Sequence, residues 1–422
     1  MATWRSRVFL EPLSLVLSLL FGAAAATAQV TNTCVDCHGA LDPPLHVSQE
    51  QFSHDIHSQK GLTCASCHGG DPTKADMEAM SKSAGFRGKI ERKQIPALCG
   101  SCHSDAAFMR KYNPSLRTDQ LSQYKTSVHG KLHASGDDKV AVCTDCHGVH
   151  DLRPPSDAAS TVHPLNVAAT CSRCHARADY MKSYGIPTDQ FAKYRSSVHH
   201  EAMTLRGDFS APTCTTCHGN HGAAPPDVGT VQNVCSTCHV FQAELYAKSP
   251  HKAAFDSATL PGCVVCHENH AVVHPTDAKV GTGADSMCLG CHVAGDAGYR
   301  TAEQIHGSLT RLSDAITNAD QILSIAEASG MEVSEARLQQ DQARDSLMKA
   351  RVSVHNFRGK PVNDEVQAGL AIAAKDLQAG KDALAERDFR RRGLSFALAS
   401  IFITVLALFL YIRQIERPRV KS

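Results

Sequence analysis

Residues 143–150 read CTDCHGVH, and this stretch decides the fold of the chain around it. Its pattern, Cys-x-x-Cys-His, occurs nine times and uses all 18 cysteines of the 422 residues. One helical turn brings both thiols to the same face, where they can form thioethers with haem while the next residue offers an imidazole to the iron. The sequence therefore predicts nine covalently bound c-type haems, each with one iron.

The attachment residues follow directly from the motif, and we number the haems 1 to 9 in chain order. No catalytic residue is predicted. The predicted thioether cysteines are Cys34, Cys37, Cys64, Cys67, Cys99, Cys102, Cys143, Cys146, Cys171, Cys174, Cys214, Cys217, Cys235, Cys238, Cys263, Cys266, Cys288 and Cys291. The predicted proximal iron ligands are His38, His68, His103, His147, His175, His218, His239, His267 and His292.

Paired cysteines have other uses in proteins. A zinc ribbon, a thioredoxin-like redox pair and a disulfide framework are the alternatives. Zinc does not require a histidine directly after every second cysteine, and redox pairs do not come nine at a time. Haem attachment explains all nine copies.

The haem region has too little apolar sequence for a conventional core. Residues 29–300 serve nine haems, or about 30 residues each, whereas a folded domain normally buries contiguous Val, Ile, Leu and Phe. Long stretches are instead Gly, Pro, Thr, Asp and His. We predict a mainly α and irregular fold, in which loops and short helices wrap a stack of haems, with little sheet.

The formal net charge of +1 omits the cofactors. Each haem carries two propionates, which ionise near neutral pH as other exposed carboxylates do, so the loaded protein is acidic. No basic stripe with interleaved aromatic residues occurs, and nothing therefore supports binding to nucleic acid.

A repeat in the sequence marks candidates for the second axial ligand. After haem 1 the motifs form four two-haem modules. The pattern Tyr-x-x-Ser-x-His precedes three of them, and Phe52 and His57 precede the first at the same spacing. In the last three modules the first motif continues as Cys-His-x-x-His, whereas the first module has Gly69-Gly70-Asp71. The predicted distal ligands are His57, His129, His150, His199, His221, His251 and His270; weaker candidates outside the register are His46, His54, His133, His163, His200 and His274.

A region without cysteine follows residue 300. Apolar residues at alternating steps of four and three predict a helix that ends at Gly330, a second over 333–357, and a third that leads into a membrane span. Gly380 occupies a position in the third helix where the spacing would place an apolar side chain, which predicts a bend or a close approach to a neighbouring segment. A stalk is one interpretation of residues 301–392. His306 and His355 are also predicted distal ligands, because an antiparallel hairpin brings both back toward the haems.

The amino terminus carries a targeting signal. Arg5 and Arg7 precede an apolar stretch that ends in Ala-Thr-Ala, so residues 1–28 are predicted to be a signal peptide cleaved before Gln29. An uncleaved amino-terminal anchor is the alternative.

The carboxyl terminus carries a membrane anchor. Residues 393–412 are predicted to be one transmembrane helix, because this stretch has no charge over a length that matches the hydrocarbon core. Basic residues flank it on both sides, so charge leaves its orientation open. Haem attachment occurs outside the cytoplasmic membrane, so we expect residues 29–392 in the periplasm and 413–422 as a cytoplasmic tail.

The doubled motifs resemble those of bacterial multihaem cytochromes c, in particular tetrahaem cytochrome c-554-like proteins. The resemblance covers residues 31–300 and implies a multihaem cytochrome c fold. The helices that follow, with His355-Asn356-Phe357, look like the helical tails of nitrite- and hydroxylamine-converting relatives. Those enzymes often replace one proximal histidine by lysine, whereas all nine motifs here end in histidine. Related quinol-oxidising tetrahaem cytochromes usually anchor at the amino terminus, unlike this chain.

Together these features predict a membrane-anchored periplasmic electron carrier built as a chain of bis-histidine haems. Its expected partners are a quinol-oxidising membrane subunit such as a cytochrome b, and a periplasmic redox protein, with either direction of electron flow. The alternative is a multihaem oxidoreductase acting on a nitrogen or sulfur oxyanion, which needs a haem without a sixth ligand. A filament of stacked cytochromes is a third interpretation, which the membrane anchor opposes.

Overall fold

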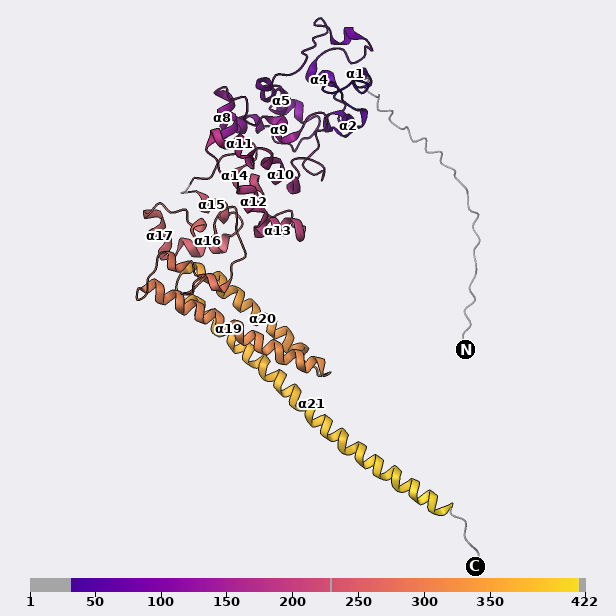
Figure 1. Cartoon of the computed structure of the whole chain (residues 1–422), viewed down its shortest axis with the longest axis vertical. Coiled ribbons are helices and arrows are strands. Elements are labelled where there is room, and N and C mark those ends of the chain that lie inside the picture. Colours follow the sequence, from indigo (N-terminus) through magenta and orange to yellow (C-terminus); the bar gives the residue numbers. More distant parts are fainter. Residues whose placement is uncertain (1–31, 228–229, 417–422) are drawn as a thin grey trace, which may run out of the picture. The chain divides into compact units, whose positions relative to one another are not determined.

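The structure is a computed structural model that describes residues 32–227 and 230–416 (Figure 1). The chain divides into two compact units: unit 1 runs to residue 116 and includes 143–154, and unit 2 contains 117–142 and everything from 155 onward. The predicted signal peptide and the end of the predicted cytoplasmic tail lie outside the described residues.

Unit 1 consists of short helices joined by loops. A bidentate ion pair from Arg92 to Asp145, with Nη2 and Oδ2 2.6 Å apart, fastens the 3-10 helix η2 (Arg92–Gln94) to the helix α9 (Cys143–His147). The helices are α1 (Thr33–His38), α2 (Gln49–His54), α3 (Ile56–Gln59), α4 (Cys64–His68), α5 (Ile95–His103), α6 (Ala106–Met109) and α9 (Cys143–His147), with 3-10 helices η1 (Met77–Met80) and η2 (Arg92–Gln94).

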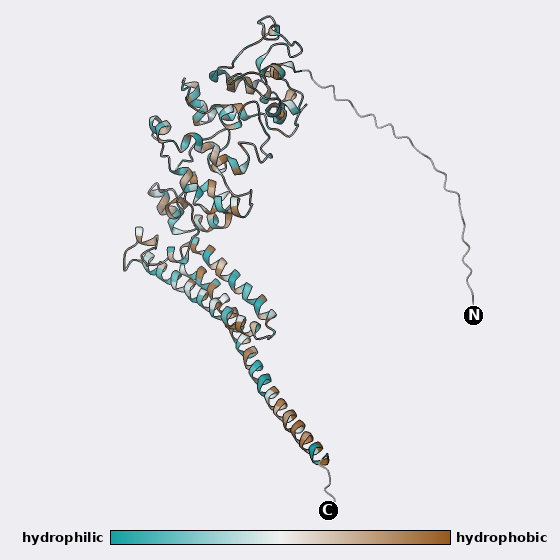
Figure 2. Ribbon diagram, turned by 45° about the vertical axis from the view of Figure 1, so that its right-hand side comes forward, coloured by the Kyte–Doolittle hydropathy of each residue, from teal (hydrophilic) through white to brown (hydrophobic). Residues whose placement is uncertain are grey.

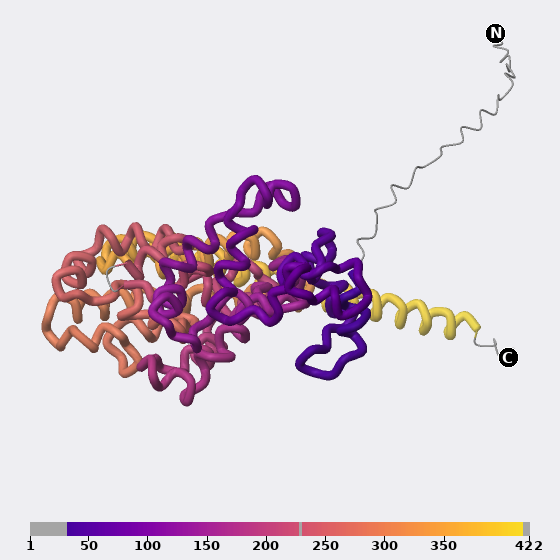
Figure 3. The backbone as a smooth tube through the Cα atoms, turned by 90° about the horizontal axis from the view of Figure 1, so that it is seen from above, coloured from indigo at the N-terminus to yellow at the C-terminus, as the bar shows by residue number. Residues whose placement is uncertain are grey.

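Unit 2 begins with similar short helices, which Figure 3 traces as a succession of tight turns, and ends in three long ones. The short helices are α7 (Gln120–Thr126), α8 (Val128–Ala134), α10 (Pro164–His175), α11 (Ala178–Met181), α12 (Gln190–Arg195), α13 (Val198–Leu205), α14 (Cys214–His218), α15 (Val231–Ser236), α16 (Val240–Ala247), α17 (Pro250–Ser257) and α18 (Cys263–His267). The 3-10 helices are η3 (Lys182–Tyr184), η4 (Asp277–Lys279), η5 (Cys288–Gly290) and η6 (Val354–Asn356). The long helices are α19 (Ala297–Ala328), α20 (Ser334–Ser353) and α21 (Gly359–Ile415).

No strand occurs in the described residues, which confirms the predicted mainly helical and irregular fold class. The Cys-x-x-Cys-His turns are locally encoded. In α4, Thr63 and Ser66 form a capping box that starts the turn, and Gly69, with φ of 68°, ends it. α14 repeats this arrangement with Thr213 at its start and Gly219 at its end.

The clusters of buried apolar side chains lie in the bundle of α19, α20 and α21. In the haem region the buried apolar residues are scattered, as at Val142, Met181 and Met203. This distribution agrees with a haem region whose interior is filled by cofactors. The larger bundle cluster is Ile305, Leu309, Leu312, Ile316, Ala343, Leu347, Ala350, Val362, Val366 and Ala373, and the smaller is Leu323, Ala326, Val333 and Ala336.

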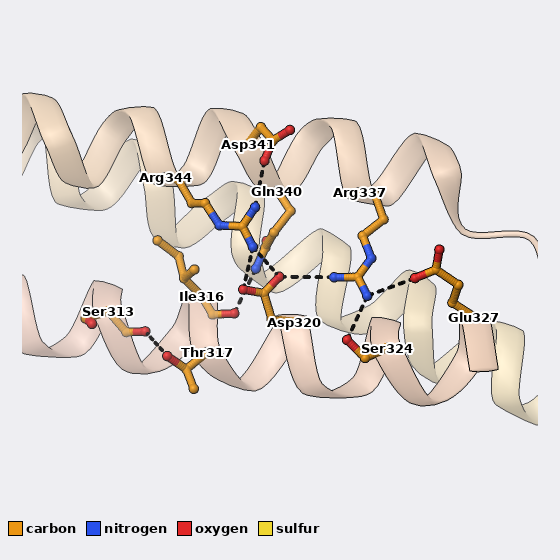
Figure 4. A network of polar contacts seen from close by, with 10 residues as sticks. All are labelled: Ser313, Ile316, Thr317, Asp320, Ser324, Glu327, Arg337, Gln340, Asp341 and Arg344. Atoms are coloured by element: carbon orange, nitrogen blue, oxygen red, sulfur yellow. Dashed lines mark hydrogen bonds and ion pairs between the residues drawn. The ribbon is translucent and has the colours of Figure 1, made fainter. Parts of the chain in front are cut away.

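A polar network joins α19 to α20 on the outside of the bundle (Figure 4). Asp320 accepts hydrogen bonds from Arg344 at 2.6 and 2.7 Å and from Arg337 at 3.3 Å. In the same network, the buried Gln340 donates to the carbonyl oxygen of Ile316 at 2.8 Å. Ion pairs at this exposure contribute little singly, but the network fixes the register between the two helices.

α21 is one continuous helix through the predicted stalk and the predicted span. At Gly380 an added Cβ would lie 2.8 Å from the Cγ2 atom of Ile322, so this glycine marks a close approach between α21 and α19. Beyond the bundle, α21 carries a window apolar enough to cross a membrane, and none of that window is buried. Figure 2 shows this end of α21 as the brown, hydrophobic part of the helix.

Asp376 of α21 is a buried carboxylate inside the bundle. It is 1% exposed, and neither carboxylate oxygen has a hydrogen-bond partner among the described residues. Burial raises its pKa. An aspartate whose pKa is higher in the folded than in the unfolded chain binds its proton more tightly when folded, so the free energy of unfolding falls as pH rises through that pKa.

We therefore expect Asp376→Asn to stabilise the bundle at neutral pH by roughly 1–3 kcal/mol, because it removes a buried charge without a partner. The variant should also flatten the loss of stability between acid and neutral pH. Chemical denaturation of the detergent-solubilised chain, followed by circular dichroism at several pH values, measures both effects. Asp382→Asn, at an exposed position of the same helix, should change stability by less than about 0.5 kcal/mol. Equal stability and an equal pH slope in Asp376→Asn and the parent would contradict this prediction.

Candidate haem-binding sites

Seven histidines of Cys-x-x-Cys-His motifs each face a second histidine ring across a similar gap. Both members of each pair lie in one unit. The ring centroids are 6.1 Å apart for His68 and His150, 6.0 Å for His103 and His57, 6.1 Å for His175 and His129, 6.0 Å for His218 and His270, 6.4 Å for His239 and His199, 6.0 Å for His267 and His355, and 5.9 Å for His292 and His251.

This spacing fits one metal ion between each pair of rings. A metal–nitrogen bond of about 2 Å on each side, plus about 1.1 Å from nitrogen to ring centre, places two trans ligands about 6.2 Å apart. The angle between the rings varies from 14° to 81° while their separation stays between 5.9 and 6.4 Å. Direct ring packing couples distance to angle, so it does not explain the constant gap. The residues present therefore fit an iron with two histidine ligands.

Burial favours the metal-binding, neutral form of seven of the paired rings. An imidazole must be neutral to act as a ligand, and burial disfavours its charged form. Burial lowers the pKa of His150, His175, His199, His251, His267, His270 and His355.

Hydrogen bonds to the second ring nitrogen orient several of these histidines. In each case Nδ1 lies within hydrogen-bond distance of a backbone carbonyl, which leaves Nε2 free for the iron. The Nδ1–oxygen distances are 2.8 Å for His38 and Leu45, 2.9 Å for His68 and Gly88, 3.2 Å for His218 and Ala224, and 2.9 Å for His355 and Val352.

The pairing follows the sequence repeat. A Tyr-x-x-Ser-x-His histidine lies opposite the proximal histidine of the second motif of its own module, as His129 does opposite His175. A Cys-His-x-x-His histidine lies opposite the first motif of the preceding module, as His270 does opposite His218. His267 belongs to the last module, and there His355 of η6 takes the distal position.

A recurring backbone hydrogen bond positions these segments. Asp55, Ser127 and Ser197 each cap a short helix two residues before a predicted distal histidine. The backbone N–H of the following residue donates to a carbonyl oxygen two residues after a Cys-His-x-x-His histidine. The three bonds join Ile56 to Leu152 at 2.7 Å, Val128 to Ala223 at 3.1 Å, and Val198 to Val272 at 2.8 Å. Each module thus holds the ligand-bearing helix of the module before it.

Cysteines of neighbouring motifs lie close to one another within each unit. The close pairs are Cys34 and Cys64, Cys99 and Cys143, Cys171 and Cys214, and Cys235 and Cys263. Haems attached at these cysteines would therefore be held near one another.

The helical tail, which consists of α19, α20, η6 and α21, is fixed to the haem region of unit 2 by specific contacts. Arg351 of α20 makes two hydrogen bonds to the Asp277 carboxylate, at 2.8 and 2.9 Å. Phe357 lies against the His251 ring with centroids 4.0 Å apart. η6 packs on α16 and carries His355 to the partly buried His267. The tail therefore reaches the sites of haems 8 and 9.

Other predicted ligands lie outside the seven pairs. His306 has its Nδ1 3.0 Å from the Asp277 carbonyl oxygen, and in the described residues its ring faces no Cys-x-x-Cys-His histidine. The described part of the chain also places no second histidine ring opposite His38. His147 and His221 are not among the seven pairs and remain predicted ligands. Of the weaker candidates, His133 and His200 lie against tyrosine rings and His163 against Phe209.

One residue that the sequence interpretation missed is Asp55, which contacts the distal ligand His57. The available signal was its position in the repeat, where the other modules have Ser127, Ser197 and Ser249.

Comparison with known proteins agrees with this geometry. Residues 16–92 match the family described as cytochrome c-type protein NrfB-like, and residues 56–176 match the cytochrome c3 family. Residues 16–176 thus resemble multihaem c-type cytochromes. These families imply covalently bound haem c with iron, and the Cys-x-x-Cys-His turns of the chain fit that cofactor.

Curated relatives are long cytochromes of Geobacter sulfurreducens. The C-type polyheme cytochrome OmcC is 24% identical over 203 residues, which are 47% of this chain and 21% of the relative. The C-type polyheme cytochrome OmcB is 22% identical over 233 residues, which are 49% of this chain and 25% of the relative. The chain thus matches a quarter or less of the length of these relatives. No solved structure matches it.

Proposed function

We propose that this chain is a membrane-anchored periplasmic electron carrier that binds nine haems. Each bound haem supplies a one-electron iron couple. The polypeptide supplies two imidazoles at each of the seven paired sites and holds attachment cysteines of neighbouring motifs close together. The observation that carries this proposal is the set of seven histidine pairs at 5.9–6.4 Å, because an iron with two protein ligands has no free position for a substrate.

The proposed ligands are the nine proximal histidines and a distal set. An imidazole binds a metal in its neutral form, and hydrogen bonds to its other ring nitrogen orient it. The proposed distal ligands are His57, His129, His150, His199, His221, His251, His270 and His355. His306 is left out because its ring faces no Cys-x-x-Cys-His histidine in the described residues, and no distal ligand is proposed for haem 1.

The exposed apolar end of α21 supports anchoring in the cytoplasmic membrane, with the haem region on the periplasmic side. Electrons would be exchanged with a quinol-oxidising membrane subunit and with a periplasmic redox protein. The predicted signal peptide and the site of haem attachment support the periplasmic location.

The alternative function is a multihaem oxidoreductase acting on a nitrogen or sulfur oxyanion. One observation favours it: in the described residues no second histidine ring faces His38, so haem 1 is the candidate for an open position. A catalytic haem at this site would be high spin and would bind small ligands.

Mass spectrometry and electron paramagnetic resonance of the oxidised, detergent-solubilised chain test the proposal. We expect nine haems, low-spin signals from haems 2 to 9, and negligible turnover of nitrite, hydroxylamine and tetrathionate. The control is the double variant Cys34→Ala and Cys37→Ala, which removes haem 1 and leaves eight. A stoichiometric high-spin signal that disappears in this variant, together with turnover that disappears with it, would establish the oxidoreductase instead.

A further inference from the structure

Asp55 stands where the other modules have serine. Ser127, Ser197 and Ser249 begin helices α8, α13 and α17, each two residues before a distal histidine. In the first module Asp55 begins α3, two residues before His57. The backbone role is shared, because all four residues occupy the helix N-cap position. The chemical difference is one buried carboxylate.

The Asp55 carboxylate makes three hydrogen bonds inside unit 1. Its Oδ1 accepts from the backbone N–H of His57 at 2.8 Å and from the Nδ1 of the same ring at 3.1 Å. Its Oδ2 accepts from the N–H of Leu152 at 3.0 Å. The residue is 3% exposed. The carboxylate accepts in all three of these hydrogen bonds, which is the pattern of its ionised form.

Ser127 and Ser197 hydrogen-bond only to backbone groups, and the Ser249 hydroxyl has no partner among the described residues. Ser127 accepts from Gly130 and donates to the carbonyl of Tyr124 at 2.6 Å. Ser197 makes the same two kinds of bond, accepting from His200 and donating to Tyr194. Near Ser249, the Nδ1 atom of His251 has no hydrogen-bond partner among the described residues.

An anionic acceptor on Nδ1 changes the ligand strength of an imidazole. The His57 ring faces His103 at 6.0 Å, so the atom bonded to Asp55 and the atom directed at the iron belong to one ring. Drawing the Nδ1 proton toward a carboxylate makes the opposite nitrogen a stronger donor. A stronger donor and a nearby negative charge both stabilise ferric over ferrous iron, which lowers the reduction potential.

We propose that Asp55 lowers the reduction potential of haem 3 relative to haems 5 and 7, whose distal histidines follow serine. This inference rests on the proposed function, since it requires His57 and His103 to bind one iron. A second carboxylate contacts a proximal ligand at haem 9, where Asp296 lies 3.3 Å from Nδ1 of His292, so haem 9 is not used as a reference. Asp55 thus makes one site in unit 1 harder to reduce than the equivalent sites in unit 2.

Potentiometric titration of the full-length holoprotein tests this role. The variants are Asp55→Asn, which keeps the shape and removes the charge, and Asp55→Ser, which restores the residue of the other modules. Each should raise one midpoint potential and leave the others unchanged. We expect at least a tenfold change in the ferrous-to-ferric ratio of that haem at fixed potential, which for one electron is about 59 mV. Ser197→Ala is the matched control, and it should shift no midpoint.

The outcomes separate the inference from the proposed function. Unchanged midpoints in both Asp55 variants, with haems 2 to 9 low spin, would make Asp55 a helix cap only. A high-spin haem 3 in the parent chain would instead overturn the bis-histidine proposal. If the Asp55 variants lose haem 3, His57→Met and His199→Met identify the midpoints of haems 3 and 7, because methionine raises the potential of the haem it ligates. The parent midpoint assigned to haem 3 must then lie below that of haem 7, and the reverse order contradicts the inference.

Discussion

His355→Ala is expected to convert one haem in nine from low spin to high spin and to open it to carbon monoxide. The His355 ring lies 6.0 Å from the ring of His267, nearly parallel to it at 18°. Its Nδ1 is bonded to the carbonyl of Val352, which leaves Nε2 free for the iron. Alanine removes the sixth ligand while the thioethers at Cys263 and Cys266 keep haem 8 attached. A new carbon monoxide difference band in the reduced variant, absent from the parent, measures the effect.

The chain supplies a control in the same tail. The His306 ring faces no Cys-x-x-Cys-His histidine in the described residues, so His306→Ala should keep every low-spin signal of the parent and gain no carbon monoxide band. His355→Met should remain low spin and raise one potential, because methionine can replace histidine as axial ligand. If His355→Ala keeps all its low-spin signals, the tail is a stalk and not a ligand-bearing element.

A chain that ends after Arg392 is expected to move from the membrane to the soluble fraction with its haems intact. The packed part of α21 ends before this point, since its buried positions run from Val362 to Gly380. Beyond it, large apolar side chains are exposed, among them Phe396 at 74% and Phe402 at 68%. A helix of this length and composition partitions into the hydrocarbon core of a bilayer. The bundle loses no buried contact when the span is removed.

Carbonate extraction of membranes, followed by haem staining, measures this change. The parent chain should resist alkaline and high-salt washing and should be released only by detergent. A chain that lacks residues 417–422 keeps the whole apolar stretch and should behave like the parent. If the chain that ends after Arg392 stays in the carbonate-washed membrane, a second anchor exists, and the apolar segment before Gln29 is the first candidate.

The haem-attachment motifs could be predicted from the sequence because their residues are neighbours in the chain. Two cysteines and a histidine within one helical turn are adjacent in any fold, so attachment residues need no tertiary information. The helical class was also predictable, because the tail stripes through Leu309, Leu312 and Val366 have helical spacing and pack as expected. The apolar membrane span could be predicted as well, since a charge-free stretch of that length is typical of a transmembrane helix.

Only the tertiary structure decided which histidine faces which motif. His57 and His103 are far apart in the sequence and meet through the folding of one module, whereas His68 and His150 meet because one module docks on the next. Tertiary packing also gives different neighbours to His306 and His355, which the sequence pattern of the helical tail does not distinguish. η6 carries His355 to His267, whereas His306 is turned to the Asp277 carbonyl. A periodic pattern records which face of a helix is buried, but it does not record what that face meets, because that depends on segments far away in the sequence.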